Sequence, residues 1–518
     1  MKFIRNLVRI VALLVILVGL LIGYLQFFTS VELLPQPQPT LEPGGPGVAL
    51  VWTVEGASAP RQQTAEQPGR LALMDMDGTL SSVMELPTGT STVIACGESA
   101  QSPDGRFFAL YAGRDSGTLY LMEGMQSPQE IDAVERSACL GTGTFAFSPD
   151  GTRFAYIDYP QGAATGDFAA GTLKVVDAAS TDTLYATEDV TAFDISNDTV
   201  AYVRFFTDDE GAADEAVVQV WDGSSSSELA SLTPDDNSQT GTCDFVSASV
   251  KVLPGDSLSL VIGQQCPRTG QSSWQLYEVN AADGATLRGE DDIVGNFQTF
   301  GRTNVQFAAP GASEFAFTAP DGVVANTAGL FAVERGDFST RQIVDRQIVM
   351  PANTTPANAT PRLSPDGRWL AFVQTSPNFE NTLVIYNLAD LSQRPTEFSA
   401  GSPGDTISAL AFAQDSRRLL AVAGGDETAN NALVMFTLSS GDNSVVARGR
   451  FHNDLAVSSN MATMGDWQFL EDDTEPPYLN LVAVNTNDGS VMTLFEGATV
   501  EDGEVVEQRF ASPLAFRR

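Results

Sequence analysis

The chain contains 518 residues, 43% of them hydrophobic, with 45 glycines and 27 prolines; it can bury a large core, but this composition does not suit a helical bundle. Its formal net charge is −37, from 28 basic and 65 acidic residues. Such an acidic surface repels phosphate backbones, so we expect no nucleic-acid partner.

The N-terminus predicts a membrane anchor. Residues 10–31 form an uncharged, apolar run, long enough to cross a bilayer as a helix of about 20 residues. Three basic residues precede the run and Glu32 follows it, so the positive-inside rule places residues 1–9 in the cytoplasm and the rest of the chain outside. A cleaved signal peptide is the alternative, but no typical cleavage site follows the run. We expect a single-pass membrane protein with a periplasmic or cell-surface domain.

Residues 32–47 form a proline-rich linker, because alternating prolines favour an extended chain. From residue 48 to residue 518 the pattern changes to short apolar or alternating runs separated by clusters of Gly, Pro, Asp, Asn and Ser. This pattern predicts strands and turns throughout, and therefore an all-β extracytoplasmic domain.

Internal repeats predict the fold. "SPDGRFFALY", "SPDGTRFAYI" and "SPDGRWLAFV" begin at Ser102, Ser148 and Ser364. Each fits a unit of four strands, which is the blade of a β-propeller, and weaker copies fill the gaps between them. We count nine imperfect units. The first unit lacks its first strand, and we expect the C-terminal segment "SPLAFRR" to complete it and close a single propeller, with eight blades favoured and seven to nine allowed.

The repeated motif is interpreted as a turn and not as a catalytic acid. Proline suits the second position of a turn, Ser and Asp bond nearby backbone groups, and Gly accepts a positive φ. An acid needed for catalysis would not recur once per blade. The predicted structural turn residues are Ser102, Pro103, Asp104, Gly105, Ser148, Pro149, Asp150, Gly151, Ser364, Pro365, Asp366 and Gly367.

The motif Ser-Pro-Asp-Gly, followed by two residues and an aromatic or Leu-Ala-Phe strand, resembles the TolB-type, WD-like β-propeller repeat. The resemblance spans residues 48–497, and it is strongest in the three units quoted above. It implies a propeller in the periplasm or at the cell surface, often one that binds other envelope proteins, and it implies no reaction.

Two local patterns suggest enzymes but do not fit this fold. "LMDMDGTL" carries Asp75 and Asp77 in the spacing of a haloacid-dehalogenase-type phosphatase, yet it falls where other units have an Asp-Gly hairpin turn. His452 is the single histidine, so a Ser–His–Asp triad would depend on it, and we expect an ordinary loop or strand residue. Bound Ca²⁺ at acidic turns is left open.

Four cysteines in an exported domain allow three pairings. Cys243 and Cys266 lie symmetrically about "LPGD", so a hairpin there would bring them together. Cys96 and Cys139 each begin the first strand of successive units and form the second possible pair. The alternative is four buried free thiols.

We therefore expect a membrane-tethered binding or scaffolding module for an envelope protein, peptide or glycan, with no enzymatic activity, cofactor or metal. The alternatives are a propeller hydrolase or lyase with acids at the central channel, or a permanent structural subunit of an envelope assembly.

Overall fold

The computed structural model describes part of the chain after the expected linker. The described residues are 48–55, 69–74, 80–85, 92–95, 100–113, 116–124, 126–135, 145–160, 170–207, 213–237, 241–253, 257–266, 271–293, 306–307, 314–319, 329–334, 336–344, 362–375, 381–400, 405–425, 430–469, 477–501 and 504–517. In these residues no helix is long and apolar enough to span a membrane. The expected tail, anchor and linker (residues 1–47) lie outside them.

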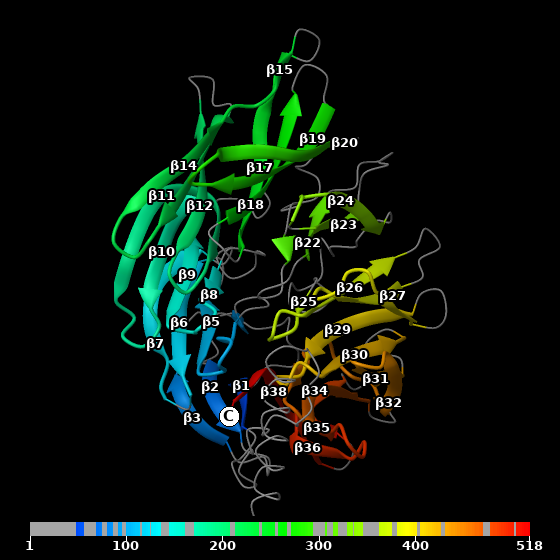
Figure 1. Cartoon of the computed structure of the whole chain (residues 1–518). Helices are drawn as coiled ribbons and strands as arrows, with labels where there is room; N and C mark the ends of the chain where they lie inside the picture. The colour runs from blue at the N-terminus through cyan, green and yellow to red at the C-terminus, as the bar shows by residue number, and fades with distance from the viewer. Residues whose placement is uncertain are drawn as a thin grey trace, which may run out of the picture. The chain divides into compact units, whose positions relative to one another are not determined.

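The described residues form strands and turns, so the expected all-β fold is confirmed. Most strands belong to four-stranded antiparallel sheets whose strands follow one another in chain order (Figure 1). These sheets consist of β4 (Thr92–Ala95), β5 (Phe107–Gly113), β6 (Ser116–Glu123) and β7 (Gln129–Glu135); β17 (Asp244–Leu253), β18 (Ser257–Cys266), β19 (Gln271–Asn280) and β20 (Gly284–Ile293); β21 (Gln306–Phe307), β22 (Glu314–Ala319), β23 (Gly329–Glu334) and β24 (Thr340–Val344); β25 (Arg362–Leu363), β26 (Trp369–Thr375), β27 (Asn381–Asn387) and β28 (Thr396–Ser399); β29 (Thr406–Phe412), β30 (Arg418–Gly424), β31 (Asn431–Thr437) and β32 (Asp442–Gly449); and β33 (Ala456–Val457), β34 (Met461–Gln468), β35 (Tyr478–Asn485) and β36 (Val491–Phe495).

A seven-stranded sheet joins two such units through one long strand. It consists of β8 (Phe145–Phe147), β9 (Arg153–Asp158), β10 (Gly171–Asp177), β11 (Thr183–Ile195), β12 (Val200–Thr207), β13 (Ala213–Trp221) and β14 (Ser226–Leu232). The first half of β11 pairs with β10 and its second half pairs with β12. Asp189, between the halves, has a φ of 61°, a left-handed conformation that bends a strand. β11 is therefore the fourth strand of one unit and the first strand of the next.

The C-terminal strand pairs with the first strand of the described chain. Its sheet has the order β3 (Leu80–Glu85), β2 (Gly69–Met74), β1 (Val48–Glu55), β38 (Glu504–Arg517) and β37 (Ala498–Glu501). Leu50 of β1 lies opposite Ala515 of β38, so "SPLAFRR" supplies the strand that the first unit lacks. Between β14 and β17 in the sequence, β15 (Asp236–Asn237) and β16 (Gly241–Thr242) form a separate two-stranded sheet.

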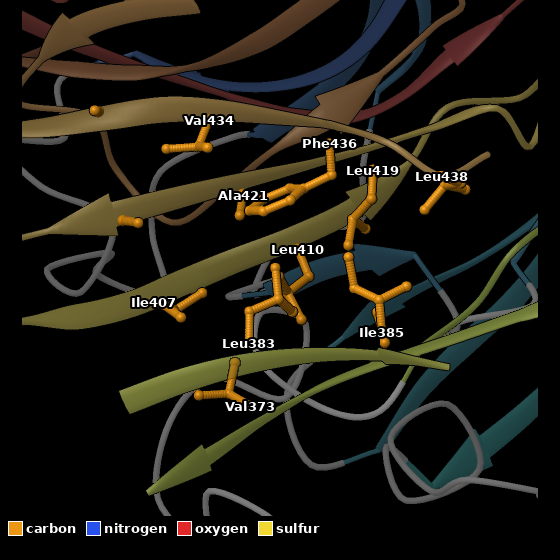
Figure 2. Packing of buried hydrophobic residues seen from close by; sticks show 13 residues of the cluster. Val373, Leu383, Ile385, Ile407, Leu410, Leu419, Ala421, Val434, Phe436 and Leu438 are labelled. Atoms are coloured by element: carbon orange, nitrogen blue, oxygen red, sulfur yellow. The ribbon is translucent and has the colours of Figure 1, made fainter. Parts of the chain in front are cut away.

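The core lies between successive sheets, each of which packs face to face on the next. Figure 2 shows one such layer, where Leu383 and Ile385 of β27 meet Leu410 of β29, Leu419 of β30 and Phe436 of β31. A sheet covered on both faces has no solvent-facing side, which explains continuous apolar strands. β5, with the sequence FFALYAG, is accordingly buried at every position.

The first strands of neighbouring sheets also lie side by side. Contacts join β11 to β17, β17 to β21, β25 to β29, β29 to β33, β33 to β38 and β38 to β4. Convergence of first strands, together with face-to-face packing of four-stranded units, is the architecture of a β-propeller.

Candidate functional site

The SPDG motif folds into a self-contained turn. In the unit that begins at Ser148, Gly151 N donates to Ser148 O at 2.8 Å and Gly151 has a φ of 71°. Ser148 is fully buried, and its Oγ donates to Asp150 Oδ1 at 2.6 Å and accepts from Arg153 N at 3.0 Å. Burial alone would raise the pKa of Asp150, but hydrogen bonds from Ser148 and Thr152 outweigh it and hold this pKa below its usual value.

The same geometry recurs at the turns that begin at Ser102 and Ser364. The buried serine donates to Asp104 Oδ1 or Asp366 Oδ1 at 2.5 Å, and the glycine φ is 73° or 70°. Asp366 N donates in turn to Ser416 Oγ, at 3.0 Å, in the corresponding turn of the next unit. These aspartates are occupied in holding turns together, and nothing in this geometry presents them to a substrate.

Two features that suggested enzymes have structural explanations. Asp75 and Asp77 lie outside the described residues, but Met74 of β2 pairs with Leu80 of β3. The motif therefore connects two adjacent antiparallel strands, whereas a phosphatase of that type needs alternating helices and strands. His452 lies before β33, with its Nδ1 3.0 Å from Asp454 Oδ1.

Two of the three lysines link neighbouring sheets. Lys174 of β10 forms an ion pair with Asp132 of β7 and lies 3.1 Å from Asp158 Oδ2. Burial alone would lower the pKa of Lys174, but hydrogen bonds to both carboxylates outweigh it and raise this pKa. Lys174 thus bridges a carboxylate of β7 and a carboxylate of β9. Lys251 of β17 reaches Asp194 Oδ1 of β11 at 3.0 Å in the same way.

No group of three or more His, Cys, Asp or Glu side chains with the geometry of a metal site occurs among the described residues.

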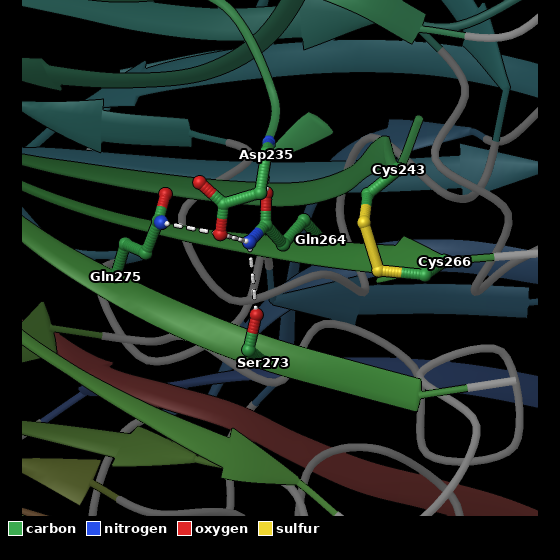
Figure 3. Close-up of a disulfide and its surroundings, with 6 residues drawn as sticks. All are labelled: Asp235, Cys243, Gln264, Cys266, Ser273 and Gln275. Carbon is green, nitrogen blue, oxygen red and sulfur yellow. Dashed lines mark hydrogen bonds between the residues drawn. A yellow bond between two sulfur atoms is a disulfide. The ribbon is translucent and has the colours of Figure 1, made fainter. Parts of the chain in front are cut away.

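A disulfide joins Cys243 to Cys266 (Figure 3). The hairpin pairs Leu253 with Ser257 and keeps that register as far as Ser247 and Gly263. Continued without interruption, this register would place Cys266 opposite Asp244. A bulge between Phe245 and Ser247 shifts the pairing by one residue and so brings the cysteines together. Cys96 and Cys139 lie outside the described residues.

Next to this disulfide, buried amides hold the chain that enters β17. Gln264 Nε2 donates to Asp235 Oδ2 and to Ser273 Oγ at 3.0 Å, and Gln275 Nε2 reaches the same Asp235 oxygen at 3.2 Å (Figure 3). Tyr277 OH donates to Gln275 Oε1 at 2.9 Å. Burial, followed by the charges of Asp235 and Glu290, raises the pKa of Tyr277 to about 12.

The two ends of each sheet differ in their connections. In an antiparallel meander, the connections from strand one to two and from three to four share one end, which we name the turn end. The other connections, from two to three and from four to the next sheet, share the loop end. Most turn-end connections are short, as from Ile195 to Val200 or from Asn280 to Gly284. Loop-end connections include that from Val344 to Arg362.

The loop end also carries both of the exposed phenylalanines found among the described residues. Phe206 and Phe469 are 36% and 42% exposed, and each lies at the end of the second strand of its unit. A guanidinium covers each ring: Arg204 Cζ lies 5.0 Å from the Phe206 centroid, and Arg450 Cζ lies 4.5 Å from that of Phe469. Aromatic and arginine side chains are enriched at protein interfaces, so the loop end is the candidate functional surface.

Sequence reasoning did not single out these residues. In the sequence, each is an aromatic residue at the end of a second strand. A single sequence does not distinguish such a residue from the aromatic core residues of the same strands. Only burial in the folded sheets separates the two groups.

No protein-family model matches the chain, and no curated protein matches it. Solved structures with a similar arrangement include a prolyl endopeptidase (14% identity, TM-score 0.41, 76% of this chain and 55% of that chain). They also include TolB from Acinetobacter baumannii (12%, 0.29, 66% and 61%) and the WD40 domain of SCAP from fission yeast (10%, 0.38, 77% and 95%).

The chain thus spans just over half the length of the prolyl endopeptidase. The similar structures include enzymes as well as TolB and a WD40 domain, so they do not support the expectation that this chain lacks enzymatic activity. All three TM-scores lie below 0.5, and the propeller architecture rests on the strand pairing and sheet packing described above.

Proposed function

We propose that this chain is a binding module: a propeller tethered to the membrane that engages a protein, peptide or glycan partner at the cell envelope through its loop end. The proposal rests on the difference between the turn end and the loop end of the sheets. The serine and aspartate of the SPDG turns bond within their own turns, whereas the loop end has the longest connection between strands and both exposed phenylalanines of the described residues. Surfaces of this kind carry function on a rigid scaffold.

The proposal includes a closed ring. Pairing of β38 with β1, and contacts of β38 with both β33 and β4, support closure through the C-terminal strand. Dividing the seven-stranded sheet at Asp189 gives nine blades, at the upper limit of the expected seven to nine and one more than the favoured eight. A closed ring presents all loop-end connections on one face.

The membrane tether and the extracytoplasmic location rest on residues 1–47 of the sequence. The Cys243–Cys266 disulfide supports them, because disulfides persist in oxidising compartments. A propeller hydrolase or lyase and a permanent envelope subunit remain the alternative functions.

Photo-crosslinking of the full chain in its native membranes tests the proposal. A photoreactive phenylalanine analogue would replace Phe206 or Phe469 at the loop end, and Ala282 or Asn487, both exposed at the turn end, in matched controls. We expect discrete crosslinked species from the loop-end positions and none from the controls. Equal yields from both ends, or no product from any position, would refute the proposed binding surface.

A further inference from the structure

The single histidine belongs to a chain of contacts that ends on the C-terminal strand. His452 Nδ1 lies 3.0 Å from Asp454 Oδ1, which also accepts a hydrogen bond from Gly465 N of β34 at 2.9 Å. The other oxygen, Asp454 Oδ2, accepts from Ser512 Oγ of β38 at 3.0 Å. The His452 and Asp454 side chains are only 14% and 11% exposed. One carboxylate therefore holds three segments together.

The order of these groups excludes the obvious catalytic interpretation. In a Ser–His–Asp triad the imidazole stands between the hydroxyl and the carboxylate, so that it can remove the serine proton. Here the carboxylate stands between the imidazole and the hydroxyl. Ser512 is accordingly not activated as a nucleophile, and the contacts tie β38 to the sheet of β33 to β36.

The chain around His452 is held in place by its backbone. Trp467 N donates to Arg450 O at 3.0 Å, and His452 N donates to Gly465 O at 2.8 Å. Phe451, between these residues, is 1% exposed and belongs to the core. The His452 side chain therefore points to the opposite side, where its ring centroid lies 6.1 Å from that of Trp467.

We propose that His452, Asp454 and Ser512 form a pH-dependent latch on β38, which is the strand that pairs with β1 in the closed ring. A protonated imidazole makes an ion pair with Asp454 and helps to keep this carboxylate in place for Ser512. A neutral imidazole lacks this charge and can offer Asp454 at most a hydrogen bond, which is a weaker attraction. Histidine is the side chain whose charge ordinarily changes between about pH 5 and pH 8, so the latch is tight in mild acid and looser above neutral pH.

The charged groups around His452 are compatible with a latch that tightens when the imidazole is protonated. Asp466 of β34 accepts from Arg450 N and from Gln468 Nε2. The guanidinium of Arg450 covers Phe469, and that of Arg509 on β38 lies over Phe495. Asp454 lies within ion-pair distance of His452.

The latch also reaches the candidate surface, and this consequence rests on the proposed function. His452 packs edge-on against Trp467, and Phe469 follows two residues later. A change in the His452 charge therefore acts next to one of the two exposed phenylalanines of the loop end.

Hydrogen exchange of the full chain in detergent tests the latch at pH 5.5 and pH 8.0, after correction for intrinsic exchange rates. We expect the protection of β38 amides to fall about two- to fivefold at the higher pH, which corresponds to an ion pair of modest strength. Amides of β29, which carries no histidine, serve as the internal control and should not change.

Two variants make the test specific. His452→Gln should abolish the pH dependence of β38, and Ser512→Ala should lower β38 protection at pH 5.5 while leaving β29 unchanged. Protection of β38 that is independent of pH in the unmodified chain, or pH dependence that survives in His452→Gln, would overturn the proposal. Because the exchange needs no partner, a failure of the crosslinking experiment leaves this result unaffected.

Discussion

Substitution of Ser148 by alanine tests the structural interpretation of the SPDG motif. The change removes the Oγ that donates to Asp150 and accepts from Arg153 N. In the variant, water can replace Ser148 as hydrogen-bond donor to the exposed Asp150 carboxylate, so losing this hydrogen bond lowers the free energy of unfolding only a little. The Arg153 amide is partly buried and loses its acceptor, which costs about 1–3 kcal/mol. We expect the free energy of unfolding to fall by about 2 kcal/mol.

The measurement is urea unfolding of the full chain in detergent, followed by circular dichroism. Ser224→Ala is the matched control, because Ser224 Oγ also donates to an aspartate, Asp222 Oδ1 at 2.8 Å, but at an exposed turn; it should change little. Equal effects of the two substitutions, or no loss of stability in Ser148→Ala, would show that the buried serine does not hold the turn.

The loss of stability in Ser148→Ala should depend on pH. The pKa of Asp150 is lowered in the folded chain, so the stability it contributes is present above the carboxyl pKa of the unfolded chain and is lost as the pH falls through the folded value. Because Asp150 accounts for only a small part of the loss, the difference in free energy of unfolding between Ser148→Ala and the unmodified chain should shrink slightly in acid, and urea unfolding at low pH measures it.

Two further predictions concern the Cys243–Cys266 disulfide and two buried tyrosines. Replacing Cys243 and Cys266 together by alanine should lower the free energy of unfolding by about 3 kcal/mol, as expected for a loop of this length. Urea unfolding in the absence of reductant measures the change, and an unaltered free energy of unfolding in the double variant would contradict a formed disulfide. Tyr277 and Tyr386, whose pKa values are both raised to about 12, should ionise well above an ordinary tyrosine, so their contribution to stability is present below about pH 10 and is lost as the pH rises toward 12. Ultraviolet titration of Tyr277→Phe should lose one late-ionising group, and loss of an early-ionising group instead would refute the assignment.

Much of the local structure could be predicted because it depends on neighbouring residues. The turn at Ser148 needs a proline, an acceptor and a glycine with positive φ within four positions, and all of them can be seen in the sequence. Ser416 shows the limit of that reasoning. It occupies the glycine position of the same turn with a φ of 54°, and the surrounding strands impose a conformation that its residue type disfavours.

The Cys243–Cys266 pair was predicted from symmetry about "LPGD", but the structure reaches it by a different route. The hairpin is centred half a residue away from that position, and a bulge restores the alignment. A bulge depends on how a strand fits its neighbours on both sides. Sequence spacing alone therefore predicted the partners but not the register that brings them together.

The sequence by itself determined the all-β class, the repeated unit and its turns, because periodicity and turn chemistry act over a few residues. The tertiary structure decided which strand ends remain exposed, how β11 serves two units, and that His452, Asp454 and Ser512 meet. These features bring together residues that are distant along the chain, such as Asp454 and Ser512. No local pattern encodes such a contact, since it arises only when separate sheets pack against one another.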